Sequence, residues 1–204
     1  MAFEADDASE AGNALVLKAE YYASAGEFDT AISTLDRVPM FALDDDSRTL
    51  LLMRKAVFLA LEGRLSEYDA LSEEIAASEA PQSLISDTYS AASSYMAEHR
   101  PALKSRDKAF FLGFLPPAAH VYAGIPGEGV LRAAGDAASI AVGVLEAVAG
   151  NWVTAFLSCG IGLYECYWKG NAAIEPAVDE FNEKALNEFR AELKDYLYSL
   201  TISQ

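Results

Sequence analysis

The sequence predicts an all-α protein, and two observations carry this prediction. Residues 8–99 are rich in Ala, Leu, Glu and Ser and poor in Val, Ile and Thr, a composition that favours helices. No stretch alternates apolar and polar side chains with the period of two that is typical of a strand. Within the 204 residues we expect helical repeats over residues 8–99, then a hydrophobic helical hairpin and an amphipathic C-terminal helix over residues 100–204.

The first part of the chain contains a pair of helices that meet at Gly26. The small residues Ala19 and Ala31 would let these two helices approach closely. The order of small residue, Tyr, Gly-x-Phe and Ala resembles the tetratricopeptide repeat, which implies antiparallel helical hairpins. The apolar positions at helical spacing are Leu15, Ala19, Tyr22, Phe28, Ala31, Ile32 and Leu35.

A second copy of this pair follows over residues 49–75, with Gly63 as its turn glycine. Tyr68 stands where the first copy has the small Ala31, so we expect the packing to open locally there. Residues 82–99 are expected to form one capping helix. Because each repeat buries its face only against a neighbour, the second half of the chain or another subunit must cover the exposed end. The candidate partner-binding residues of the repeats are Tyr22, Phe28, Leu59 and Tyr68.

The formal net charge of −16 excludes one class of partner. Binding to nucleic acid needs clustered Lys and Arg against the phosphates, so we expect no nucleic-acid partner. A basic protein partner or simple solubility fits the charge better. Locally, "DDDS" at residues 44–47 supplies N-cap oxygens and negative charge at a helix start.

A basic segment, "RPALKSRDK" at residues 100–108, directly precedes the apolar middle of the chain. Basic residues beside an apolar segment follow the positive-inside pattern of membrane proteins. The alternative is a solvated loop that balances an acidic face, and the sequence leaves both interpretations open.

The apolar middle begins with "FFLGFLPPAAHVYAGIPGEGVLR" at residues 110–132 and continues as two further apolar pieces, 130–149 and 152–167. A bilayer span needs about 20 apolar residues. In the piece 130–149, the Val, Ile and Leu residues return about 3 kcal/mol, against roughly 5 kcal/mol for Asp136 and Glu146 placed deep in lipid. Alone this piece should not insert, whereas in a hairpin its charges could face inward or lie near the ends.

Residues 106–184 resemble the C-terminal region of a bacterial envelope protein family with a tetratricopeptide-like N-terminal part. That family's pattern is an "iPGxGQxYaGxxxxG" turn, a two-helix hydrophobic hairpin, a "Y-x-GN" motif and an amphipathic helix. Here Pro-Ala-Ala-His (117–120) stands where Pro-Gly-x-Gly-Gln is usual. The resemblance implies membrane association and a scaffold-like role, and no reaction. The matching turn and hairpin residues are Pro116, Tyr122, Ala123, Gly124, Gly129, Tyr167, Gly170, Asn171 and Asn182.

The last part of the chain, from Ile174 to Leu200, repeats apolar residues every three or four positions and predicts one long amphipathic helix. Its apolar stripe is expected to pack on the hairpin or on the end of the repeats. The alternative is a helix that binds in a partner's groove.

Three residues could support chemistry: His120, Asp136 and Glu146. His120 lies in the apolar run, and as a general base it would need a nearby nucleophile or a second titrating group. Asp136 is spaced to pair with Arg132 at (i, i+4), which favours a structural role. No catalytic serine motif, phosphate loop or dinucleotide motif is present in the sequence.

The two cysteines, Cys159 and Cys166, are expected to be small buried hydrophobes, since seven helical residues separate them by about 10 Å. They show no metal-ligand spacing, and we expect no metal and no cofactor.

Together these features predict a non-enzymatic protein–protein interaction adaptor or scaffold at a bacterial envelope membrane, with membrane contact through residues 106–171. The opening lacks the basic and apolar regions of a signal peptide, which leaves a cytoplasmic protein, or one whose signal has been removed. Two alternatives stay open: a helical enzyme or small-molecule site around His120, Asp136 and Glu146, and an ordinary helical core that buries the hairpin. The oligomeric state and the partner are also open.

Overall fold

The computed structural model describes residues 2–78, 82–115 and 117–202. Within these ranges the chain is helical and contains no β-strand, which confirms the predicted all-α class. The chain divides into two compact units: unit 1 comprises Met1–Pro101 and Leu186–Gln204, and unit 2 comprises Ala102–Ala185. The last helix therefore begins in unit 2 and ends in unit 1, whereas the sequence analysis assigned all of it to the second part.

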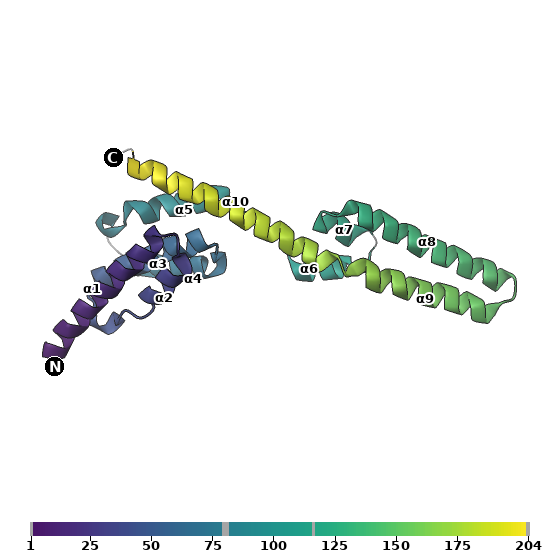
Figure 1. The fold of residues 1–204 in the computed structure, drawn as a ribbon, viewed down its shortest axis with the longest axis horizontal. Helices are drawn as coiled ribbons and strands as arrows, with labels where there is room; N and C mark the ends of the chain where they lie inside the picture. Colours follow the sequence, from purple (N-terminus) through teal and green to yellow (C-terminus); the bar gives the residue numbers. More distant parts are fainter. Residues whose placement is uncertain (1, 79–81, 116, 203–204) are drawn as a thin grey trace. The chain divides into compact units, whose positions relative to one another are not determined.

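Unit 1 is a series of helices joined by short turns. Helix α1 packs on α2, α2 on α3, and α3 on both α4 and α5 (Figure 1). The elements are α1 (Ala2–Ser24), α2 (Phe28–Leu35), η1 (Met40–Ala42), α3 (Asp45–Glu62), α4 (Leu65–Ala77), η2 (Gln82–Leu84), α5 (Asp87–His99) and the later part of α10 (Ile174–Ile202).

The turns of unit 1 follow the sequence signals closely. Gly26 and Gly63 both adopt positive φ, 81° and 77°, at the ends of α1 and α3. Only glycine occupies this left-handed region without steric cost. The N–H of Ser47 donates to Asp44 Oδ1 at 2.7 Å, so Asp44 is the N-cap of α3 as the "DDDS" segment predicted.

The expected capping helix starts later than predicted. Residues 82–84 form the short η2, and α5 begins at Asp87. Ser86 fixes this start, because its Oγ accepts a hydrogen bond from the N–H of Tyr89 at 3.1 Å. The single helix predicted over residues 82–99 is therefore wrong for its first turn.

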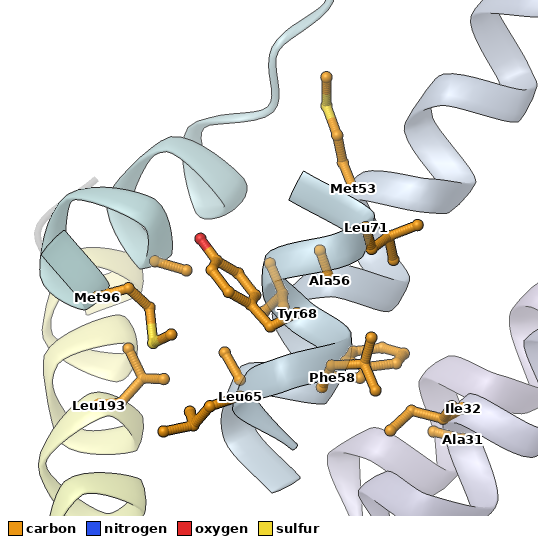
Figure 2. Packing of buried hydrophobic residues seen from close by; sticks show 14 of the residues in the cluster. Ala31, Ile32, Met53, Ala56, Phe58, Leu65, Tyr68, Leu71, Met96 and Leu193 are labelled. Carbon is orange, nitrogen blue, oxygen red and sulfur yellow. The ribbon is translucent and has the colours of Figure 1, made fainter. Parts of the chain in front are cut away.

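The core of unit 1 combines small and large apolar side chains. Ala19, Ala31 and Ala56 are fully buried, as expected of positions where helices approach closely. Tyr68 is also buried, and its hydroxyl lies 2.9 Å from Ser93 Oγ of α5. The larger side chain at this position is accommodated because it points toward α5. Figure 2 shows Tyr68 among the core residues that surround it.

The later part of α10 belongs to this core. Phe189 and Leu193 are buried in it, and Leu193 lies beside Met96 (Figure 2). On its polar side, Arg190 donates through Nε to the Leu61 carbonyl at 3.2 Å and pairs with Glu62 at 2.5 Å. From Leu186 on, the amphipathic stripe thus packs on the other helices of unit 1.

Unit 2 is organised around two long helices, α8 and α9, that lie side by side as a hairpin (Figure 1). Gly150, at φ 83°, makes the turn between them. A small core joins α6, α7 and the start of α10 through Ala109, Ala119, Ala123, Ile174 and Val178. The elements are α6 (Arg106–Leu112), α7 (Ala118–Ala123), α8 (Pro126–Val148), α9 (Trp152–Asn171) and the first part of α10.

The turn that the motif predicts around Tyr122 and Gly124 is made at Gly124 alone. Tyr122 lies inside the short helix α7, and Gly124, at φ 95°, ends that helix. Helix α8 then starts at Pro126, because proline has no N–H to leave unpaired in a first turn. Gly129 consequently lies within the first turns of α8.

Candidate functional site

The glycines singled out from the sequence gather at the base of the hairpin, where α7 meets α8 and α9. A Cβ at Gly129 would lie 2.6 Å from His120 Cβ, so only glycine lets α7 approach α8 here. The carbonyl of Gly170, in α9, accepts a hydrogen bond from His120 Nε2 at 2.7 Å. Gly129, from the first part of the family motif, and Gly170, from its last part, therefore both contact His120.

Arg132 is buried at the same base and ties three elements together. Its Nη2 donates to the Gly113 carbonyl at 3.0 Å, at the end of α6, and its Nη1 donates to Asn171 Oδ1, at the end of α9. Its Nε lies 3.7 Å from Asp136 Oδ2, which is the (i, i+4) pair that the spacing predicted. The guanidinium also lies over the Tyr167 ring, 5.3 Å from its centroid.

His120 is fully buried, and a carbonyl partner fixes its tautomer. Because a carbonyl can only accept, the proton must lie on Nε2. Its Nδ1 has no hydrogen-bond partner in the part of the chain that the structure describes. The geometry gives His120 a structural contact with Gly170, and within the described residues no nucleophile is hydrogen-bonded to its ring.

The three residues of the alternative enzymatic site do not come together. His120 contacts Gly170 and Asp136 pairs with Arg132, both at the hairpin base. Glu146 lies near the opposite end of α8, where it accepts from Asn151 Nδ2 at 2.9 Å. Ten helical residues separate Asp136 from Glu146, which is about 15 Å along the axis. Within the described residues, no three His, Cys, Asp or Glu side chains are grouped to hold a metal ion.

The segment before α6 is pinned by side chains that the sequence motif includes. The Tyr122 hydroxyl accepts from the N–H of Ser105 at 2.8 Å. Asn182 accepts from the N–H of Lys104 at 2.7 Å and donates to its carbonyl at 2.9 Å. Both residues thus have structural partners, while Pro116 of the same motif lies outside the described residues.

The seam between α8 and α9 is made of small residues. A Cβ at Gly143 would lie 2.7 Å from Cys159 Cβ, and a Cβ at Gly162 would lie 2.5 Å from Ser139 Oγ. Ala155 is buried, and its carbonyl would lie 3.3 Å from the same Gly143 Cβ. The two helices therefore approach closely over their small residues, and large side chains are excluded from the seam.

The large apolar side chains of the hairpin point outward instead. Leu145 is 70% exposed and Trp152 is 71% exposed. Within unit 2, these side chains are covered neither by α6 and α7 nor by the first part of α10. In the described part of the chain, no helix has both the length and the apolar character needed to cross a membrane. The exposed side chains of the hairpin are Val130, Leu131, Ile140, Val142, Val144, Leu145, Val148, Trp152, Val153, Phe156, Leu157, Ile161, Tyr164 and Trp168.

The basic segment before the hairpin is largely engaged with acidic residues. Arg100 makes a two-pronged pair with Asp69, both hydrogen bonds at 2.7 Å. Arg106 makes the same arrangement with Asp179, also at 2.7 Å, and this hydrogen bond raises the pKa of Arg106. For these two arginines the structure favours the second interpretation, a segment that balances acidic side chains.

The four candidate partner-binding residues of unit 1 divide into two kinds. Leu59 and Tyr68 are buried within the core, so their side chains have no surface to offer a partner. Tyr22 and Phe28 are partly exposed and pack against that core from outside. Only the latter two stay as candidates for contact with a partner.

One concave feature, beside the hairpin base, was not predicted from the sequence. It is a groove of about 620 Å³ lined by aromatic residues, including Phe110, Tyr167 and Trp168. Arg106 and Glu175, which also line it, pair with each other at 3.3 Å. These two charged groups thus already have a partner within the protein.

Comparison with known proteins adds no assignment to this geometry. No protein-family model matches the chain, and searches of curated proteins and of solved structures returned no match. The likeness to tetratricopeptide repeats and to the envelope family therefore stays a prediction that rests on the quoted motifs.

Proposed function

We propose that the protein is a non-enzymatic adaptor or scaffold that associates with a bacterial envelope membrane through the α8–α9 hairpin. One observation carries the proposal: the hairpin keeps small and polar residues in its seam and presents its large apolar side chains outward. The helical repeats of unit 1 would then be available to a protein partner.

This arrangement is the reverse of what water favours. In water, helices pair by burying large apolar side chains between them. In lipid that driving force is absent, and close packing over small residues such as Gly143 and Gly162 becomes the main attraction. The polar pair Arg132–Asp136 also lies on the inner side of α8, where membrane helices keep their charges.

The insertion free energy of the pair of helices is more favourable than that of α8 alone. Arg132 and Asp136 pair with each other at the base and are shielded from lipid there. The acidic side chain that remains near the tip is Glu146. Placed deep in lipid it costs roughly 2.5–3.5 kcal/mol, while the aliphatic and Phe side chains below return about 3–5 kcal/mol in total. The contributing exposed residues are Ile140, Val142, Val144, Leu145, Val148, Val153, Phe156, Leu157 and Ile161.

Flotation of purified full-length protein with lipid vesicles tests the membrane part of the proposal. The wild-type protein should float, and Leu145→Arg should weaken binding by about 100-fold, since an arginine in the apolar layer costs several kcal/mol. Leu17→Arg is the matched control, because Leu17 is 67% exposed on α1, outside the hairpin. Equal flotation of both variants, or no flotation of the wild type, would contradict the proposal.

The adaptor part has its own test, which does not depend on lipid. A basic protein partner is the expected kind, because the chain carries a net charge of −16. Leu145→Arg protein should still capture the partner that the wild type captures from envelope extract, and salt should weaken that capture. Loss of capture in Leu145→Arg, or capture that is indifferent to salt, would count against an acidic partner surface on the repeats.

A further inference from the structure

We propose that the hairpin enters the bilayer tip first, to about the middle, rather than lying flat on the surface or crossing it. This inference rests on the proposed function, because it describes how the same hairpin meets lipid. It follows from where the charges lie, from the absence of a charged outer face, and from the length of the two arms.

The charges of the hairpin are confined to its base, with one exception. Residues 137–164, which form both arms and the tip, contain a single charged side chain, Glu146. Even this one has a partner, since Asn151 donates to it at 2.9 Å across the turn. A bilayer has the same layered chemistry, with hydrocarbon inside and charged head groups outside, so the tip matches the former and the base the latter. The charged residues of the base are Glu128, Arg132, Asp136, Glu165 and Lys169.

Neither arm has the charged face that a helix lying on a membrane requires. Surface-bound helices present Lys, Arg or acidic residues to water along one side. In α8 the exposed Ile140, Val144 and Leu145 cover the outer side, and the remaining side faces the seam at Gly143. In the tip half of α9 the most polar side chains are Thr154 and Ser158, which are uncharged.

Aromatic residues mark the expected water boundary. Tyr164 and Trp168 stack with ring centroids 6.2 Å apart, and Phe114 packs on Tyr167 at 5.8 Å, all at the base. Tyr and Trp favour the level of the head groups. In the same two turns of α9, Lys169 pairs with Glu165. These aromatic side chains and this ion pair thus place the base at the membrane surface.

The arms beyond Asp136 and Glu165 are too short to reach the other side. From Asp136 to the end of α8, and from Glu165 back to the start of α9, the arms extend about 18–20 Å at 1.5 Å per residue. The hydrocarbon layer is about 30 Å thick. With its base at the surface, the tip would therefore stop among the acyl chains.

The two tryptophans of the chain supply a natural test of depth. Trp152 is the first residue of α9, at the tip, and Trp168 lies near its end, at the base; they are 71% and 67% exposed. Trp168→Phe and Trp152→Phe each leave one reporter in the full-length protein. Each variant is bound to vesicles of phosphatidylethanolamine and phosphatidylglycerol that carry bromine either near the head group or near the end of the acyl chain.

We expect bromine near the chain end to quench Trp152 more strongly and bromine near the head group to quench Trp168 more strongly. Trp152 emission should also shift to the blue on binding. Head-group quenching of both residues would overturn the inference: it would indicate a hairpin that lies flat, or one whose tip reaches the far surface.

Flotation of the same samples separates this inference from the proposed function. If the wild type does not float, the membrane role itself fails. If it floats but the order of quenching is not reversed between the two tryptophans, only tip-first entry fails. Both variants should keep floating, since Phe is among the residues that favour insertion. Self-association of the hairpin in place of lipid binding would appear as a wild-type oligomer that does not float, and it would overturn the inference.

Discussion

Individual glycines decide the turns of unit 1, and two of them form a matched pair. Gly26 and Gly63 share nearly the same positive φ, 81° and 77°. A Cβ at Gly26 would have open space, whereas one at Gly63 would meet Arg190 Nε at 3.3 Å and Leu186 Cδ2 at 3.5 Å. The backbone cost of replacing glycine can therefore be separated from the cost of crowding.

We predict that Gly26→Ala lowers the free energy of unfolding by about 1–2 kcal/mol through backbone strain alone. Gly63→Ala should lower it further, because Arg190 would have to shift from Glu62 and the Leu61 carbonyl. Urea denaturation followed by circular dichroism measures both. Gly26→Asn is the control and should cost less than Gly26→Ala, since Asn tolerates positive φ. Equal costs for Gly26→Ala and Gly63→Ala would refute the crowding at Arg190.

Asp44 gives a pH prediction at the start of α3. The hydrogen bond from the Ser47 N–H holds the pKa of Asp44 below its ordinary value. Its ionised form therefore stabilises the folded state above the ordinary pKa of about 3.9, and this contribution is lost as the pH falls through the lower folded value. Asp44→Asn should be less stable than wild type at neutral pH and equally stable in strong acid. A stability difference that stays constant across this range would contradict the assignment.

At the scale of helices, the hairpin seam should make the substitution of glycine by alanine stabilising at one position of unit 2 and destabilising at another. Gly143 faces Cys159 across the seam, whereas a Cβ at Gly160 would meet nothing within 4 Å. Alanine in a helix interior is favoured over glycine by roughly 0.5–1 kcal/mol. Gly160→Ala should therefore stabilise unit 2, while Gly143→Ala should destabilise it by forcing α8 and α9 apart. Thermal unfolding of the two variants measures this, and the same sign of change for both would refute the seam.

The sequence predicted the helices better than it predicted which way they face. Gly63, Asp44 and the Arg132–Asp136 pair could be assigned because each depends on local geometry within a turn or two. Leu59 and Tyr68 are predicted partner contacts, but both are buried. The prediction fails because periodicity shows that residues share a face but not what covers that face.

The sequence analysis also did not predict which side of each hairpin helix faces the other, for a related reason. When a helix is apolar on all sides, periodicity cannot tell the seam from the outer surface. The signal that could have found it is the set of small residues Ser139, Gly143, Cys159 and Gly162, which are spaced three or four apart on each helix. Cys159 faces Gly143 in the seam but is half-buried, less than the full burial expected, and the side chain of Cys166 lies outside the described part of the structure.

At the scale of the whole molecule, the chain combines an all-helical unit rich in acidic residues with a hairpin that presents apolar side chains. The division of α10 between the two units could not be read from its continuous apolar stripe. The stripe is the same along its length, but Ile174 and Val178 pack in unit 2, and Phe189 and Leu193 pack in unit 1. Which partner each part of a stripe meets depends on tertiary contacts that periodicity does not encode.

The central claim is that lipid covers the outward apolar face of the hairpin. Fractionation of cells that express the untagged full-length protein tests this claim most directly. The protein should stay in the membrane pellet through washes with high salt and alkaline carbonate. A Leu145→Arg, Val153→Arg variant should appear in the supernatant, while Leu17→Arg should remain in the pellet. Wild-type protein that is released by salt alone, or that is found in the supernatant from the start, would contradict the claim.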